Sequence, residues 1–217
     1  MRVAVAEDSR LFRQALVDML GSLGLEVVIA TGRADDLLLR LEGTTVDVVL
    51  LDIRMPPTRT DEGLRAAERI RRRHPHIGIL VLSTFTGGHY AERLLTLGDR
   101  GVGYLLKDDV DNVDTLGDAL RRVASGGCII DPTVISALLA RQRHIKVLER
   151  LNESERRVLV MMAEGQSNAG IAATAKISKK TVEKHITAVF GKLDLPWEEN
   201  RNRRVLAVLE WLRAMDA

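Results

Sequence analysis

Residues 46–52 have the sequence VDVVLLD, a nearly continuous apolar run that ends in a carboxylate. A run of this kind predicts a strand buried on both faces, as at the centre of a parallel sheet that helices cover. In open sheets of this type, ligands bind beyond the carboxyl ends of the strands. We therefore expect Asp52 to lie at the ligand-binding edge of the sheet.

The first 125 residues alternate short β-branched runs with longer amphipathic segments, which predicts a parallel sheet covered by helices. Strands are expected at residues 2–6, 25–30, 46–52, 77–82 and 102–105. Helices are expected from an N-cap at Ser9 to Gly24, and at roughly 33–41, 62–73, 88–98 and 111–125. The predicted fold is α/β, with a doubly wound, flavodoxin-like sheet of five parallel strands.

The pattern changes after residue 125, where the strand signals disappear. Turn residues at 126–127 and 131–132 are followed by a predicted helix at about 133–150. Short helices are then expected at 154–164, 168–174, 179–192 and 203–214. We predict an α/β domain at 1–125, a linker with a helix at 126–150, and an all-α domain at 151–217.

Length and composition limit the classes of protein to be considered. A chain of 217 residues suits two small domains. No apolar run approaches the roughly 18 residues that cross a bilayer, and the chain starts without the pattern of a secretory signal. A soluble, cytoplasmic protein without membrane contact is expected. The single cysteine, Cys128, excludes an intramolecular disulfide and is predicted to be a small buried apolar group.

The charge is unevenly divided along the chain. Residues 1–131 hold 17 Lys and Arg and 20 Asp and Glu, whereas residues 132–217 hold 15 and 10. The basic excess in the C-terminal part favours a nucleic acid as its partner.

Polar side chains follow the predicted strand ends at Glu7, Asp8, Asp52, Ser83 and Lys107. The three carboxylates would repel one another without a cation, and Mg²⁺ prefers such oxygen ligands together with phosphate oxygens. Lys107 and the Ser83 hydroxyl can bind further phosphate oxygens. A carboxylate in this setting is a suitable nucleophile toward phosphorus, which predicts an aspartyl phosphate at Asp52.

Four motifs together, AEDS at 6–9, VLLDIRMP at 49–56, VLS at 81–83 and GYLLKD at 103–108, closely resemble the receiver domains of response regulators. The resemblance covers about 125 residues. It implies that a histidine kinase phosphorylates Asp52, and that Glu7, Asp8 and the backbone carbonyl of Arg54 complete a Mg²⁺ site. Further implied roles fall to the phosphoryl-binding and switch residues, which are Ser83, Lys107 and the aromatic Tyr104. Thr84, adjacent to Ser83, is the alternative switch hydroxyl.

The loop after Pro56 departs from the family pattern. Many relatives have a compact Gly-Met-Asp-Gly turn there, whereas this chain has the longer and more polar sequence PTRTDEG at 57–63. We expect this loop to alter kinase access or the lifetime of the phosphoryl group.

Residues 167–185 have the layout of a helix-turn-helix, in which a second helix, capped by Ser178, enters the major groove. Apolar positions from Val182 to Leu193 form its buried stripe. The opposite face carries side chains suited to phosphates and base edges, and we predict DNA contacts at Lys179, Lys180, Thr181, Glu183, Lys184 and Thr187.

Residues 151–212 resemble the LuxR-type output domain of the NarL/FixJ class, on the motifs LNESERRVL at 151–159, AEGQSN at 163–168 and SKKTVEKH at 178–185. The resemblance implies binding to double-stranded DNA as a homodimer on activation. It places the dimer contact on the last helix, at Arg203, Val205, Val208, Leu209 and Leu212. Ala169-Gly170 replaces a common Lys-Glu pair, which predicts reduced DNA affinity.

Two alternatives to the kinase-controlled regulator remain. A haloacid-dehalogenase-like phosphatase also forms an aspartyl phosphate, but it needs an acid two residues after the nucleophile, where Arg54 stands. We therefore expect no enzyme of this class. The second alternative is a DNA-binding regulator that a ligand or a partner protein controls without phosphorylation.

Overall fold

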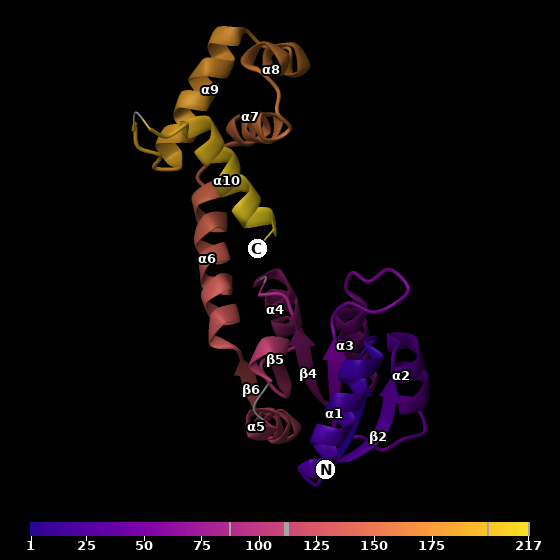
Figure 1. Cartoon of the computed structure of the whole chain (residues 1–217). Coiled ribbons are helices and arrows are strands. Elements are labelled where there is room, and N and C mark those ends of the chain that lie inside the picture. The colour runs from indigo at the N-terminus through magenta and orange to yellow at the C-terminus, as the bar shows by residue number, and fades with distance from the viewer. Residues whose placement is uncertain (87, 111–112, 199, 217) are drawn as a thin grey trace. The chain divides into compact units, whose positions relative to one another are not determined.

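The computed structural model describes residues 1–86, 88–110, 113–198 and 200–216 (Figure 1). The chain divides into two compact units, residues 1–136 and residues 137–217. Residues 111 and 112, where the fifth helix was expected to begin, and residue 217, the predicted end of the all-α domain, lie outside the described residues.

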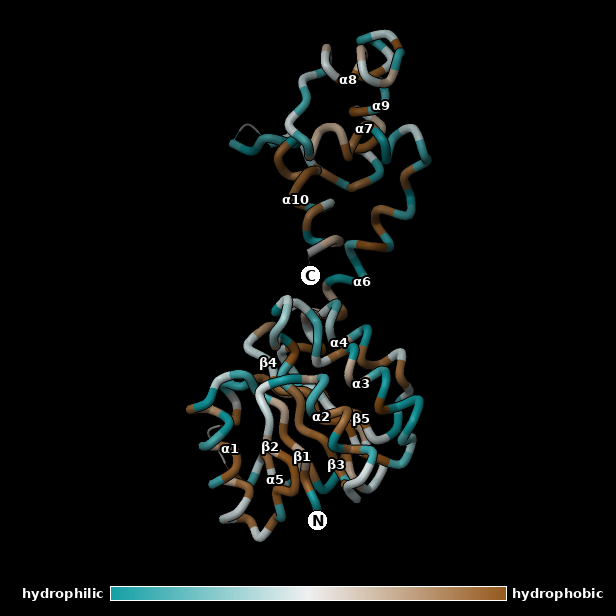
Figure 2. Tube along the Cα trace, turned by 90° about the vertical axis from the view of Figure 1, so that its right-hand side faces the viewer, coloured by the Kyte–Doolittle hydropathy of each residue, from teal (hydrophilic) through white to brown (hydrophobic). Residues whose placement is uncertain are grey.

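The first unit is built on one parallel sheet with the strand order β2-β1-β3-β4-β5-β6. The strands are β1 (Arg2–Ala6), β2 (Glu26–Thr31), β3 (Val48–Asp52), β4 (Gly78–Ser83), β5 (Val102–Leu106) and β6 (Cys128–Ile130). Every residue of β3, β4 and β5 is buried, which confirms that the apolar runs belong to the centre of the sheet. In Figure 2 the strands at the centre of this unit are largely coloured as hydrophobic.

Helices cover both faces of this sheet. They are α1 (Arg10–Ser22), α2 (Ala34–Leu41), α3 (Glu62–Arg73), α4 (Gly88–Leu95) and α5 (Val113–Ala124). Helix α1 contacts α5, whereas α2 contacts α3 and α3 contacts α4, so the two groups lie on opposite faces (Figure 1). Ser9 caps α1 by accepting a hydrogen bond from the Phe12 amide, as its position before the apolar period predicts.

The sheet has six strands, whereas the sequence predicted five. Strand β6 lies within the predicted linker and pairs with β5. Its three residues, between a Gly pair and Asp131-Pro132, are too few to show a strand period. Cys128 at its start is only partly buried, whereas the sequence predicted a buried side chain.

The second unit is helical. Helix α6 (Pro132–Leu148) begins in the first unit and continues into the second, where α7 (Glu153–Ala163), α8 (Asn168–Ala175), α9 (Lys179–Lys192) and α10 (Arg203–Asp216) follow. Asn152 and Glu155 form a capping box at the start of α7. Val158, Leu159, Val182 and Val189 are among the buried side chains of its core. Among the helices that the structure describes, none has the length and apolarity needed to cross a membrane.

Gly63 lies in close contact with the end of β3. A Cβ atom at this position would be 1.8 Å from the Asp52 carbonyl oxygen and 3.0 Å from the Ile53 Cα. The Gly63 amide also donates a 2.9 Å hydrogen bond to the Ile53 carbonyl. The first turn of α3 is therefore held directly against the strand that carries Asp52.

We predict that Gly63→Ala lowers the free energy of unfolding of the first unit by at least about 2 kcal/mol, because backbone atoms must move to admit the methyl group. Urea denaturation followed by circular dichroism measures the change. Gly21→Ala in α1 is the matched control, since no described atom outside its chain neighbours and the backbone of its own helix lies within 4 Å of its Cβ position. Equal stability of the Gly63 and Gly21 variants would contradict the prediction.

Candidate functional site

Three carboxylates meet at the carboxyl ends of the central strands. Asp52 is the last residue of β3, and Glu7 and Asp8 follow β1. One oxygen from each of Glu7, Asp8 and Asp52 lies within 4.8 Å of the others. Glu7 and Asp52 are buried, and Asp8 is partly exposed. The polar edge that the sequence predicted thus brings these three residues together.

The Lys107 ammonium bridges two of these carboxylates. Its Nζ atom lies 2.7 Å from a Glu7 oxygen and 3.0 Å from an Asp52 oxygen. Burial lowers the pKa of Lys107, but the hydrogen bond to Glu7 and the charge of Asp52 outweigh burial and raise the pKa. Burial raises the pKa of Asp52 to about 6 against the opposing effect of Lys107. The ion pair thus favours the charged form of both groups.

The third carboxylate has a different cation. Nη2 of Arg59, from the polar loop at 57–63, lies 3.5 Å from an Asp8 oxygen. Sequence reasoning assigned no role to this arginine, because its contact depends on the path of the loop. The backbone of Arg59 has a φ of 56°, in the left-handed region that non-glycine residues rarely adopt.

Glu62 fastens this loop. Its Oε1 atom accepts hydrogen bonds from the Thr58 amide at 3.0 Å and from the Thr58 hydroxyl, and its Oε2 atom accepts one from the Thr60 amide at 2.9 Å. Burial raises the pKa of Glu62, but these hydrogen bonds outweigh it and lower the pKa to about 2. Asp61 binds Arg93 and Arg65, which ties the loop to α4 and α3. The departure from the family pattern is therefore an ordered structure.

Ser83 and Tyr104 both hold the segment after β4. Ser83 is fully buried and its hydroxyl accepts a 2.9 Å hydrogen bond from the Phe85 amide. The buried Tyr104 hydroxyl donates a 2.7 Å hydrogen bond to the Phe85 carbonyl. Thr84, the alternative switch hydroxyl, is exposed. The two predicted switch residues thus meet at Phe85, which sequence reasoning missed.

The side chain of Arg54 lies over the same segment. Its guanidinium carbon is 3.6 Å from the centroid of the Phe85 ring, and Nη2 donates a 3.1 Å hydrogen bond to the Tyr90 hydroxyl. Sequence reasoning gave Arg54 a role only through its backbone carbonyl. The structure adds a cation–π contact with Phe85 and a hydrogen bond to Tyr90, and the hydrogen bond links the segment after β3 to α4.

The donor set fits a small divalent cation. Glu7, Asp8 and Asp52 offer three oxygens close together in a partly buried site, where their mutual repulsion favours a hard cation. The site as described is an acidic pocket consistent with Mg²⁺.

A groove with a volume of about 710 Å³ lies along the exposed face of α9. Its lining includes five of the six residues that we predicted to contact DNA, which are Lys180, Thr181, Glu183, Lys184 and Thr187. Lys179 is exposed but is not part of the lining. The buried stripe of α9 contains Val182, Ile186 and Val189, as the apolar period predicts.

Two hydroxyls in this groove are already used within the helix. The Thr181 hydroxyl lies 2.8 Å from that of Ser178, and the Thr187 hydroxyl donates to the Glu183 carbonyl at 2.9 Å. Lys180, Glu183 and Lys184 also line the groove, and all three are exposed.

The predicted dimer residues on α10 have different surroundings. Val205, Leu209 and Leu212 are exposed, whereas Val208 packs against the core of the second unit. Arg203 lies over the ring of Phe190, 4.8 Å from its centroid. The exposed three recur every three or four residues and thus share one helix face.

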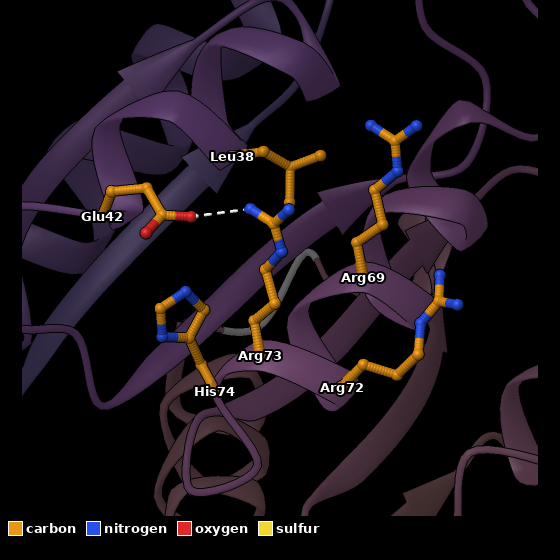
Figure 3. Close-up of a pocket in the computed structure, with 6 residues that line it drawn as sticks. All are labelled: Leu38, Glu42, Arg69, Arg72, Arg73 and His74. Atoms are coloured by element: carbon orange, nitrogen blue, oxygen red, sulfur yellow. Dashed lines mark hydrogen bonds and ion pairs between the residues drawn. The ribbon is translucent and has the colours of Figure 1, made fainter.

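A second cavity, of about 540 Å³, lies between the C-terminal ends of α2 and α3 (Figure 3). Arg69, Arg72 and Arg73 line it, and Arg73 donates a 2.8 Å hydrogen bond to Glu42. Arg71, next to them in the sequence, binds the carbonyls of Pro75, Arg100 and Gly101. These positive charges lie at the C-terminus of a helix, where its dipole favours them.

Two family models match the chain. The model described as a response regulator receiver domain matches residues 3–117, and the model described as bacterial regulatory proteins, luxR family, matches residues 149–211. The transcriptional regulatory protein DegU of Brevibacillus brevis is 30% identical over 98% of this chain and 93% of its own length.

Solved structures show the same architecture. A structure of two RcsB dimers bound to two parallel DNAs has a TM-score of 0.64 at 23% identity, over 99% of this chain and 98% of the other. RcsB of Salmonella enterica serovar Typhimurium, bound to the promoter rprA in the presence of the phosphomimetic BeF3−, has a TM-score of 0.59 at 25% identity, over 99% of both chains.

We predict that Glu62→Gln lowers the free energy of unfolding of the first unit by about 1–2 kcal/mol at pH 7, because an amide NH2 replaces an acceptor of the loop hydrogen bonds. A pKa below that of an unfolded glutamate stabilises the fold above about pH 4.5. That contribution is lost as the pH falls from about 4.5 to 2, so wild type and variant converge there.

Urea denaturation at several pH values tests this, with Glu42→Gln as an exposed control that also removes a carboxylate paired with an arginine. A deficit of the Glu62 variant that stays constant down to pH 2.5 would refute the electrostatic account.

Proposed function

The chain belongs to the response regulators that join a receiver domain to a LuxR-family DNA-binding domain, and from this we propose that Asp52 is its phosphoacceptor and Mg²⁺ its metal. The supporting observation is the meeting of Glu7, Asp8 and Asp52 within 4.8 Å beside the Lys107 ammonium. A sensor histidine kinase is the proposed donor. The protein thereby acts as a transcriptional regulator of a two-component system, in the cytoplasm.

The chemistry follows from the charges. An Asp52 oxygen lone pair forms the new P–O bond, while the P–N bond to the donor histidine breaks and its electron pair returns to the imidazole nitrogen. Lys107 stabilises the charge that develops on the phosphoryl oxygens. Glu7, Asp8, Asp52 and the Arg54 carbonyl would hold Mg²⁺, which supplies further charge neutralisation when bound.

Phosphorylation then changes the segment around Phe85. The buried Ser83 hydroxyl, which now accepts from the Phe85 amide, can instead donate to a phosphoryl oxygen. This exchange removes one of the two hydrogen bonds that hold the Phe85 backbone. The other, from the Tyr104 hydroxyl to the Phe85 carbonyl, remains. We propose that this exchange biases the receiver between two conformations.

For the output, we propose that residues 151–217 bind double-stranded DNA through α9, with Lys179, Lys180 and Lys184 on phosphates or base edges. The receiver would span residues 1–125 and the linker residues 126–150. A homodimer through the α10 residues Arg203, Val205, Val208, Leu209 and Leu212 would bind two half-sites. RcsB, solved as dimers bound to DNA, supports binding as a dimer.

We predict that the chain, incubated with acetyl phosphate and Mg²⁺, gains the mass of one phosphoryl group in intact-protein mass spectrometry, because the small donor provides the same electrophilic phosphorus as a kinase. Asp52→Asn abolishes the gain, and chelation of the metal suppresses it. Asp47→Asn is the control, which changes a carboxylate that accepts from the Arg2 amide, and this variant should show the same mass gain as wild type. Modification of the Asp52→Asn protein at the wild-type level would refute the assignment of Asp52.

We also predict that Lys180→Ala and Lys184→Ala each weaken binding to double-stranded DNA about three- to tenfold, since each removes one phosphate contact and the counterions it releases. Fluorescence anisotropy at several salt concentrations measures the loss and a fall of about one in the salt slope. Lys146→Ala, on the exposed surface of α6, is the control. Unchanged affinity in both α9 variants would exclude this face as the DNA surface.

A further inference from the structure

Each of the three carboxylates in the acid cluster has a cationic partner in the described structure. Lys107 binds Glu7 and Asp52, and Arg59 binds Asp8. We propose that Arg59 is a resident counter-charge of this pocket, which weakens Mg²⁺ binding to the unmodified protein and stabilises the pocket after Asp52 is phosphorylated. This inference rests on the proposed phosphoacceptor function.

The loop is built to hold Arg59 at the mouth of the pocket. The amides of Thr58 and Thr60, the residues on either side, donate to the buried carboxylate of Glu62. The Arg59 amide donates a 3.0 Å hydrogen bond to the Met55 carbonyl. These bonds keep the backbone at a φ of 56°, which its sequence alone disfavours. The position of Arg59 is thus set by the folded loop.

The guanidinium group itself is weakly held. The side chain is 69% exposed and its described contact with Asp8 is a single ion pair at 3.5 Å. Such a pair is weak in water, so a divalent ion can displace the guanidinium from Asp8 at little cost. The positive charge nevertheless stays near the pocket because the loop backbone is fixed.

The sign of the effect depends on the state of Asp52. In the unmodified protein, three carboxylates and the Lys107 ammonium leave two negative charges, which one divalent ion neutralises. Arg59 then adds one positive charge too many and repels the ion. A phosphoryl group replaces the single charge of the Asp52 carboxylate with about two negative charges. With the ion bound, Arg59 now neutralises the remaining charge.

Isothermal titration calorimetry with Mg²⁺ and the full chain tests the first half. We expect Arg59→Gln to bind Mg²⁺ about three- to tenfold more tightly than wild type at low ionic strength, and this difference to shrink toward 1 M salt. Arg59→Asn is a second charge-removing variant, because asparagine tolerates the left-handed backbone. Arg59→Lys keeps the charge and should match wild type.

Beryllofluoride, a phosphoryl mimic, tests the second half. At saturating Mg²⁺, we expect Arg59→Gln to bind beryllofluoride about three- to tenfold more weakly than wild type, measured by fluorine NMR. The control is Arg40→Gln, which removes an exposed arginine that is paired with Asp36 away from the cluster. It should change neither affinity.

Opposite shifts of the two affinities in both charge-removing variants support the inference. Unchanged Mg²⁺ affinity, or weaker Mg²⁺ binding in Arg59→Gln and Arg59→Asn, overturns it while leaving the phosphoacceptor proposal intact. If wild type binds no Mg²⁺, or binds it equally well after Asp52→Asn and Asp8→Asn changes, both proposals fail together.

Discussion

The arrangement of the first unit depends on one partly buried ammonium group shared between two carboxylates. Without Lys107, Glu7 and Asp52 would be two buried like charges at adjacent strand ends, a costly arrangement in a region of low dielectric constant. Lys107 can reach both because parallel strands all end at the same edge and β5 follows β4 in the sheet. The chemistry of the site therefore depends directly on the strand order.

The loop after β3 shows how a local departure becomes part of a site. Gly63 allows α3 to begin against the backbone of Asp52. Glu62, the residue before it, accepts hydrogen bonds from amides of the loop. The loop then carries an arginine to the one carboxylate that Lys107 does not bind. The polar loop beside the charged pocket thus adds a positive charge to its electrostatics.

The sequence predicts the sheet centre, the polar edge and α9 well because each has a strong period or a motif with fixed spacing. The bounds 179–192 are those of the predicted helix. The sequence could not predict β6, because its three residues show no period. It also could not predict the contact between Arg59 and Asp8, because that contact depends on tertiary structure. The internal hydrogen bonds of Thr181 and Thr187 were also hidden, because a hydroxyl that faces outward can still bond to its own helix.

Strand β6 connects the sheet of the receiver to the start of α6 through backbone hydrogen bonds. Ile130 pairs with Tyr104, and the Asp131 amide donates a 2.9 Å hydrogen bond to the Tyr104 carbonyl. The Asp131 side chain in turn accepts from the Thr133 amide in the first turn of α6. Tyr104, whose hydroxyl binds the Phe85 carbonyl, is therefore joined through its own backbone groups to the start of α6. A shift of the Tyr104 backbone would therefore act on the first turn of α6 through these two hydrogen bonds, without an intermediary helix.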